Sequence, residues 1–305
     1  ARDVAWRRAE LEQATLLLMS SHASLEARSR IRQAGGRHNA SRPVLIPSAR
    51  EPVEVIPLAH PPHAVVLSPR LERAIRETLD TGGRVALYLN RRGYAPALLC
   101  TACRTVPRCP RCQVALTYSQ EARSVRCRAC GFHSPAPDHC PGCRGTQFDL
   151  IGCGTERLEA DVRQRFPTAR VRRWDRDTSK RTTRRGGDLP SRPDESWHIA
   201  IGTKLMVREI PPRSCALVGV VYAEAGLHVP DFRASERAYQ ELSDVASLAN
   251  LAMGGRVLMQ TCLPAHPVIR ALATGDRSAW EREEIALREA LDYPPVASLI
   301  ALEVT

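Results

Sequence analysis

The sequence contains no run close to the roughly 18 consecutive apolar residues that a membrane-spanning helix requires. Its first residues, Ala1, Arg2 and Asp3, do not open the apolar segment of a secretory signal peptide. We therefore expect neither a membrane protein nor a secreted or fibrous one. Without an export signal, the 11 cysteines are expected in the reducing cytoplasm, where metal binding is more common than disulfide formation.

Lysine and asparagine are also scarce. Lys180 and Lys204 are the two lysines among 44 lysines and arginines, which leaves 42 arginines. This bias is typical of GC-rich coding as much as of selection for an anionic ligand. The formal net charge of +11 is therefore weak support for nucleic-acid binding, and the position of the charges matters more than their sum.

The rest of the composition is that of a folded protein, with 43% hydrophobic and 25% charged residues. A length of 305 residues suggests about two domains. Short apolar segments, typical of strands buried on both faces, alternate with helical patterns; they lie at residues 85–89, 199–201, 216–222 and 256–261. This alternation predicts an α/β fold with a parallel sheet that is covered on both sides.

Apolar spacing and end signals place the helices. One helix should open at Ser68-Pro69 and end before Gly82-Gly83. The other predicted helices span residues 2–14, 24–32, 155–166, 234–251 and 280–291. Further strands are predicted at residues 16–19 and 299–304, and residues 175–195 are predicted to form a polar loop.

Eight of the 11 cysteines form four Cys-x-x-Cys pairs in a segment without regular hydrophobic periodicity. The pairs are Cys100/Cys103, Cys109/Cys112, Cys127/Cys130 and Cys140/Cys143. Each pair presents two thiolates from one tight turn, which is half of a tetrahedral zinc site, so the segment predicts two zinc ions per chain. Disulfides or redox-active pairs are the alternative, which four such pairs in one short segment disfavour.

The four pairs can combine in two ways. Consecutive pairing would join Cys100/Cys103 to Cys109/Cys112 across only five residues, which is sterically cramped. Nested pairing joins Cys109/Cys112 to Cys127/Cys130 across 14 residues, as in a zinc ribbon, and leaves Cys100/Cys103 with Cys140/Cys143 to close the base. We favour nesting. Because the segment has few apolar residues, the metal must supply much of its folding free energy.

Five other residues with potential ligand atoms are expected to have different roles. His133 and His139 are candidate ligands, but the cysteines already complete both sites, so we expect exposed histidines. Cys153, Cys215 and Cys262 border or lie in predicted strands and are expected to be core thiols.

Two stretches are candidates for contacting nucleic acid. Residues 163–192 hold eleven basic residues against three acids, and Arg172, Arg173 and Arg176 could pair with phosphates. A solvated, arginine-biased loop is the equal alternative. Arg91, Arg92 and Tyr94 could bind single strands through charge and stacking, or could form a turn that only orders the cysteine segment.

The sequence resembles the PriA family of primosomal replication-restart proteins (primosomal protein N′). The resemblance is carried by the run LNRRGYAP at residues 89–96, which leads directly into the eight cysteines. Further matches occur in family order: ARDVA at 1–5, LE at 25–26, GTE at 154–156, DRDT at 175–178, IGT at 201–203, PDFRASER at 230–237 and YPP at 293–295.

The resemblance implies RecA-like lobes of a superfamily 2 DNA helicase, with the two-zinc module inserted in the second lobe and nested zinc ligands. The implied domains are a first-lobe remnant and linker (1–60), the start of the second lobe (61–99), the zinc-binding insertion (100–150), the remainder of that lobe (151–265), and a helical connector with the start of a C-terminal domain (266–305). No phosphate-binding loop G-x-x-x-x-G-K-[ST] occurs, so we expect a fragment that begins after the nucleotide site.

The helicase motifs implied by the resemblance are degraded. The family's GSATPS reads MSSHAS at residues 19–24, and GTQMxxKG reads GTKLMVRE at 202–209. QVAGRAGR reads DVASLANL at 244–251, so Leu248 and Leu251 stand where arginines would reach the γ-phosphate, and Asp244 replaces a glutamine. Such an arginine can contribute about 10³ or more in rate, which leucine cannot replace. No catalytic residue is therefore assigned.

Three hypotheses follow. The first is a replication-restart protein without helicase activity that recognises abandoned forks and helps to reload the replicative helicase. The resemblance implies its partners: forked and single-stranded DNA, primosome proteins, the replicative helicase and its loader, and single-stranded DNA-binding protein, in the cytoplasm with the nucleoid and with no membrane. The second is an active ATP-dependent 3′–5′ DNA helicase with two structural zincs. The third is a zinc ribbon serving RNA or transcription, against which the long family-ordered matches argue.

Overall fold

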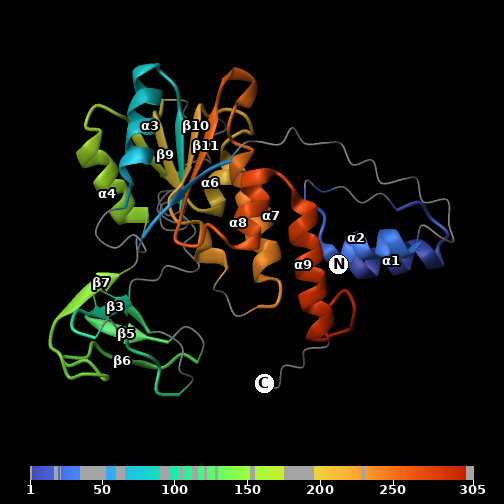
Figure 1. Ribbon diagram of the computed structural model, residues 1–305, viewed down its shortest axis with the longest axis horizontal. Coiled ribbons are helices and arrows are strands. Elements are labelled where there is room, and N and C mark those ends of the chain that lie inside the picture. The colour runs from blue at the N-terminus through green and yellow to red at the C-terminus, as the bar shows by residue number, and fades with distance from the viewer. Residues whose placement is uncertain are drawn as a thin grey trace, which may run out of the picture. The chain divides into compact units, whose positions relative to one another are not determined.

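Figure 1 presents the computed structural model of the chain. It describes residues 2–16, 20, 22–34, 53–59, 66–89, 97–103, 106–111, 116–119, 122–127, 130–151, 155–174, 196–227 and 231–299. The chain divides into a smaller unit, residues 1–46 with 285–305, and a larger unit, residues 47–284.

A six-stranded sheet in the order β1-β11-β10-β2-β9-β8 forms the centre of the larger unit. Every neighbouring pair runs parallel. The strands are β1 (Val53–Pro57), β2 (Val85–Tyr88), β8 (Val171–Trp174), β9 (Ile199–Gly202), β10 (Leu217–Val220) and β11 (Arg256–Thr261). All residues of β2, β9 and β10 are buried, as strands covered on both faces require. The predicted α/β fold with a parallel sheet is confirmed.

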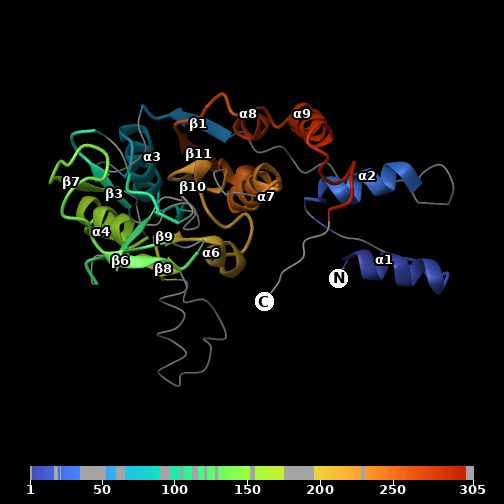
Figure 2. The same cartoon turned by 90° about the horizontal axis from the view of Figure 1, so that it is seen from below.

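Helices cover both faces of this sheet (Figures 1 and 2). Side chains alternate along β2, so that Leu87 packs with α3 (Pro69–Asp80) and α4 (Thr155–Arg165). Tyr88 packs on the opposite face with α6 (Lys204–Glu209), α7 (Ala234–Ala246) and α8 (Pro267–Thr274). Among the described residues, no helix combines the length and the apolar character needed to cross a membrane.

Helix α3 begins where the sequence predicts. Ser68 caps it by accepting a hydrogen bond from the Leu71 N–H at 3.3 Å, and Pro69 follows in the first turn. The backbone N–H of Ser68 donates to Oε1 of the buried Gln260 on β11, at 2.7 Å. The amide of Gln260 also donates to the carbonyls of Val66 and Val221, so one buried side chain joins the start of α3 to the sheet.

The helix predicted over residues 234–251 is too long, because α7 ends at Ala246. Beyond it, the carbonyl of Ser247 accepts from the Arg213 N–H at 2.9 Å, and a parallel bridge pairs Cys215 with Ala249. Hydrogen bonding to the segment before β10 therefore replaces helical hydrogen bonding. The apolar residues after 246 pack into the core from a turn and the short 3-10 helix η2 (Leu251–Met253), which their helical spacing alone does not reveal.

Several other expectations differ from the structure or lie outside the described residues. The sequence did not predict β8, α6 or α8, because β8 is rich in arginine and both helices are short. In the strand expected at residues 16–19, Leu16 is exposed and 17–19 are outside the described ranges, as are residues 300–305. Strand β1 lies within residues 1–60, which are expected to be a first-lobe remnant and linker, but it pairs with β11 of the large sheet.

In the smaller unit, a buried ion pair links two helices. The unit contains α1 (Arg2–Leu11), α2 (Leu25–Ala34) and the end of α9 (Arg277–Ala290), and the pair links α2 with α9. Arg288 is 1% exposed, and its guanidinium lies 3.9 Å from the carboxylate of Glu26 on α2. It also donates to the carbonyl of Pro294 at 3.3 Å. The pair therefore connects α2 with the end of α9 and the segment that follows it.

Candidate metal centre

The cysteine-rich insertion (residues 97–151) contains two small antiparallel sheets. Strands β3 (Ala97–Cys100) and β7 (Phe148–Ile151) pair where the chain enters and leaves, with Cys100 opposite Phe148. Strands β4 (Thr117–Ser119), β5 (Ser124–Arg126) and β6 (His133–Pro135) form a three-stranded sheet. Its apolar cluster is small and includes Cys109 and Cys127. Such a small cluster provides little hydrophobic stabilisation, so we expect the fold of the insertion to depend on cross-links such as bound metal.

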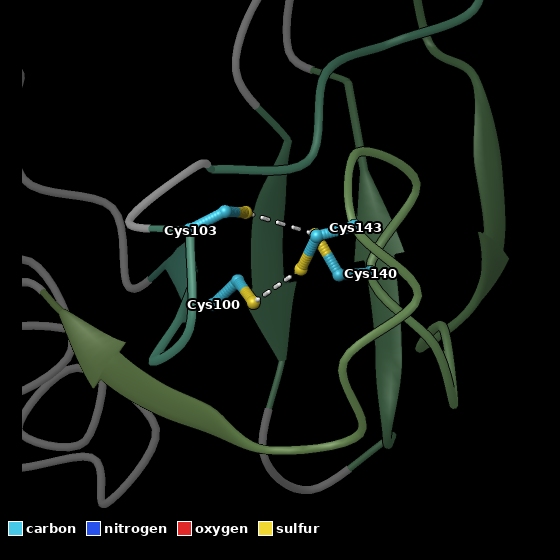
Figure 3. Close-up of side chains that lie close together, drawn as sticks. All are labelled: Cys100, Cys103, Cys140 and Cys143. Carbon is cyan, nitrogen blue, oxygen red and sulfur yellow. Dashed lines mark hydrogen bonds between the residues drawn. The ribbon is translucent and has the colours of Figure 1, made fainter.

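Four cysteines converge at the first centre, which is the two-stranded end of the insertion (Figure 3). All four Sγ atoms of Cys100, Cys103, Cys140 and Cys143 lie within 4.8 Å of one another. Sγ of Cys100 is 3.5 Å from that of Cys143, and Sγ of Cys103 is 3.5 Å from that of Cys140. A tetrahedral zinc site with Zn–S bonds of about 2.3 Å places its sulfurs about 3.8 Å apart. The four residues therefore fit zinc.

The acid–base properties of the four thiols at the first centre also favour binding of a cation. The backbone N–H of Cys103 lowers the pKa of the Cys100 thiol, since it donates to the thiolate form. The N–H of Gly145 lowers the pKa of Cys143, but the neighbouring thiols of Cys103 and Cys100 raise it overall to about 12. Four thiolates repel one another at these distances, and a divalent cation would remove that repulsion.

The second centre brings together Cys109, Cys127 and Cys130. Sγ of Cys109 lies 3.5 Å from that of Cys130, and Cys109 and Cys127 are buried. Cys112, the expected fourth ligand, lies outside the described residues. The seven described cysteines of the four Cys-x-x-Cys pairs are thus grouped as nested pairing requires. His133 and His139 are exposed and belong to neither group.

Two of the Cys-x-x-Cys turns share one backbone geometry. The N–H of Gly131 donates to the carbonyl of Cys127 at 3.1 Å, and that of Arg144 donates to the carbonyl of Cys140 at 2.9 Å. Gly131 and Arg144 have positive φ, 75° and 61°. A residue in the left-handed region directly after the second cysteine is therefore part of the turn. Gly131 is the sequence signal for it that the spacing argument missed.

The remaining described cysteines are not part of either centre. Cys215 is completely buried, and burial raises the pKa of its thiol to about 11. Burial and, after it, the carboxylate of Glu224 raise the pKa of Cys262 to about 11. Both are packing thiols of low reactivity. Cys153 lies outside the described residues.

The residues expected to contact nucleic acid have intramolecular contacts where they are described. The guanidinium of Arg173 on β8 lies 3.1 Å from Glu159 and 3.5 Å from Glu156, both on α4. The guanidinium of Arg172 lies over the ring of Trp174, 4.6 Å from its centre. Arg91, Arg92, Tyr94 and Arg176 lie outside the described residues.

The positions of the degraded arginine motif are part of the protein core. Leu248 is completely buried in the cluster formed by α7, α8 and the sheet, and the half-buried Leu251 packs against that cluster. Asp244, near the end of α7, accepts a hydrogen bond from the Ser247 hydroxyl at its carbonyl, at 2.6 Å. Leu248 and Leu251, which stand where the family resemblance implies arginines, therefore contribute apolar packing in this chain.

Comparison with known proteins agrees with this architecture. A family model described as the PriA DNA helicase Cys-rich region (CRR) domain matches residues 109–135. The replication restart protein PriA of Bacillus subtilis is 30% identical over 311 residues, which cover 100% of this chain and 38% of that protein. PriA of Chlamydia pneumoniae is 33% identical over 310 residues, covering 98% of this chain and 41% of the relative. The chain thus spans about two fifths of the length of these curated relatives.

Proposed function

Because the chain is a PriA-like protein, we propose that it acts in replication restart without ATP-driven unwinding of its own. In this role it would recognise stalled or abandoned forks and promote primosome assembly and reloading of the replicative helicase. Its proposed partners are forked and single-stranded DNA, primosome proteins, the helicase with its loader, and single-stranded DNA-binding protein.

The burial of Leu248 carries the proposal that unwinding is lost. An arginine at this position would have to leave the core to meet a γ-phosphate, whereas Leu248 lies in the buried apolar cluster that also includes Val245, Val268 and Ile269. The side chain at this position is thus part of the core packing. Transition-state charge would lack its arginine, a loss of about 10³-fold or more in rate.

The proposed cofactor is zinc, two ions per chain, in a structural role. Cys100, Cys103, Cys140 and Cys143 would hold one ion, and Cys109, Cys112, Cys127 and Cys130 the other. When bound, zinc would supply cross-links between the strands of the insertion. We further propose that β1 together with residues 61–99 and 151–265 forms one RecA-like lobe, which the cysteine-rich insertion interrupts. Metal analysis that found fewer than about two zincs per chain would contradict the cofactor assignment.

The proposal is tested with the full-length protein by measuring fork binding and ATP turnover in parallel. Fluorescence anisotropy should show tighter binding to a forked DNA than to a blunt duplex of equal length. Hydrolysis should stay at the no-enzyme background with or without the fork, while an authentic DNA-stimulated helicase serves as the positive control.

The two measurements fail for different reasons. Robust hydrolysis stimulated by the fork would overturn the loss of unwinding and favour the active 3′–5′ helicase. Equal affinity for fork and duplex would instead overturn fork recognition, and with it the proposed role in restart.

A further inference from the structure

The arginines of the cysteine-rich insertion are not distributed at random. Six of its seven arginines stand directly beside one of the eight paired cysteines in the sequence: Arg104, Arg108, Arg111, Arg126, Arg128 and Arg144. Arg123 is the exception. Three carboxylates, those of Glu121, Asp138 and Asp149, oppose the seven arginines, which leaves a surplus of four positive charges.

Two zinc–thiolate centres would offset this surplus. One divalent zinc held by four thiolates carries two negative charges, because a ligand cysteine binds as the thiolate. Two such centres carry four negative charges, equal in size to the arginine surplus. The zinc-loaded insertion is therefore close to neutral, although its sequence reads as basic.

The structure places two of these arginines around the second centre. Arg126 lies directly opposite His133, in the last pair of β5 and β6 before the turn that carries Cys127 and Cys130. Both side chains are exposed, and no carboxylate of the described residues pairs with Arg126. A basic residue that faces a histidine in this way has no anionic cross-strand neighbour with which to form an ion pair.

Arg111 lies in a turn elsewhere in the insertion and contacts Phe132, which follows the turn that carries Cys127 and Cys130. Its guanidinium lies over the ring of Phe132, 5.7 Å from the centre. The carbonyl of Phe132 accepts a hydrogen bond from the N–H of Cys127 at 2.7 Å. The contact therefore holds a positive charge beside the backbone that positions one buried ligand.

From this arrangement we propose that Arg111 and Arg126 are positioning residues of the second zinc centre. They supply no ligand atom; their positive charges stabilise the anionic zinc–thiolate form and slow the departure of zinc. The inference concerns the metal centre alone and does not depend on the role in replication restart. It also means that Arg111 and Arg126 act as counter-charges of the metal centre, so these two arginines do not mark a phosphate-binding surface.

Zinc transfer from the loaded full-length protein to a chromophoric chelator tests the proposal. The variants are Arg126→Gln, Arg111→Gln, the double variant, Arg126→Lys and the matched control Arg123→Gln. A unit charge about 10 Å from a doubly negative centre in a high-dielectric medium changes an equilibrium about threefold. We therefore expect Arg126→Gln to speed one of the two zinc-release phases about threefold at about 10 mM salt, and the double variant to speed it further. Arg126→Lys and Arg123→Gln should release zinc at the wild-type rate.

Salt separates charge from packing. At about 1 M salt the Debye length falls to about 3 Å, so the difference between Arg126→Gln and wild type should vanish. Equal release by Arg126→Gln and Arg123→Gln would overturn the proposal. So would a faster release that persists in Arg126→Lys or at high salt, since that result would assign Arg126 a packing role.

Discussion

The carbonyl oxygen of Leu248 accepts a hydrogen bond from the backbone N–H of Cys215, at 3.0 Å. This bond holds the segment after α7 against the start of β10, and it fixes the direction in which the Leu248 side chain enters the core. The segment that resembles the family's arginine motif is therefore part of the folded core. Four predictions follow from this and from the metal centres.

Leu248→Arg should destabilise the protein without restoring ATP hydrolysis. A guanidinium at a completely buried position without a partner costs several kcal/mol, on the order of 3–5. We expect a clear drop in the midpoint of thermal unfolding, followed by circular dichroism. Met253→Arg is the matched control, since Met253 is 82% exposed in the same segment and should leave the midpoint unchanged. An unchanged midpoint for Leu248→Arg would contradict the packing role.

Gly131→Ala should weaken the second metal centre. The position has φ of 75°, which costs an L-residue about 1 kcal/mol or more, and no atom within 4 Å would obstruct the added Cβ. The penalty is therefore one of backbone conformation, and zinc release to a chelator should become several-fold faster. Gly131→Asn should lose less, because asparagine tolerates the left-handed region better. Equal losses for Ala and Asn would point to a side-chain effect.

Chelation of zinc should unfold the insertion and spare the large sheet. The small apolar cluster around Val125 cannot replace two metal cross-links, each of which can contribute roughly 10 kcal/mol of binding free energy. Hydrogen exchange should show lost protection at residues 124–126 after treatment with a chelator, whereas residues 85–88 of β2 stay protected. Loss of protection in both segments would mean that the sheet also depends on the metal.

Alkaline pH should weaken the fold through Cys215. Burial raises the pKa of this thiol to about 11 in the folded chain, above the value of about 8.5 for an exposed cysteine. The unfolded chain therefore loses its proton first, and the free energy of unfolding falls as the pH rises from about 9 towards 11.

Cys215→Ala isolates this contribution, since every other group titrates in both proteins. The difference in unfolding free energy between wild type and variant, measured by urea denaturation, should shrink across that pH interval. A difference that stays constant from pH 8 to 11 would show that the thiol titrates normally.

The sequence alone determined the α/β class and the grouping of the cysteines into pairs. Both are local signals: buried parallel strands are nearly all apolar, and a Cys-x-x-Cys turn brings two thiols together whatever surrounds it. Ser68-Pro69 likewise marked the start of α3, because capping depends on the residues of a single turn.

Tertiary structure alone decided the end of α7, the order of the six strands, and the fate of Leu248 and Arg173. Leucines at helical spacing suit a helix or a packed turn equally well, and only the pairing of Cys215 with Ala249 selects the turn. Arg173 reads as a free cation in the sequence, but the packing of β8 against α4 places Glu159 3.1 Å away. The end of α7 and the ion pair of Arg173 both depend on contacts between residues distant in the chain, and no local sequence pattern encodes such contacts.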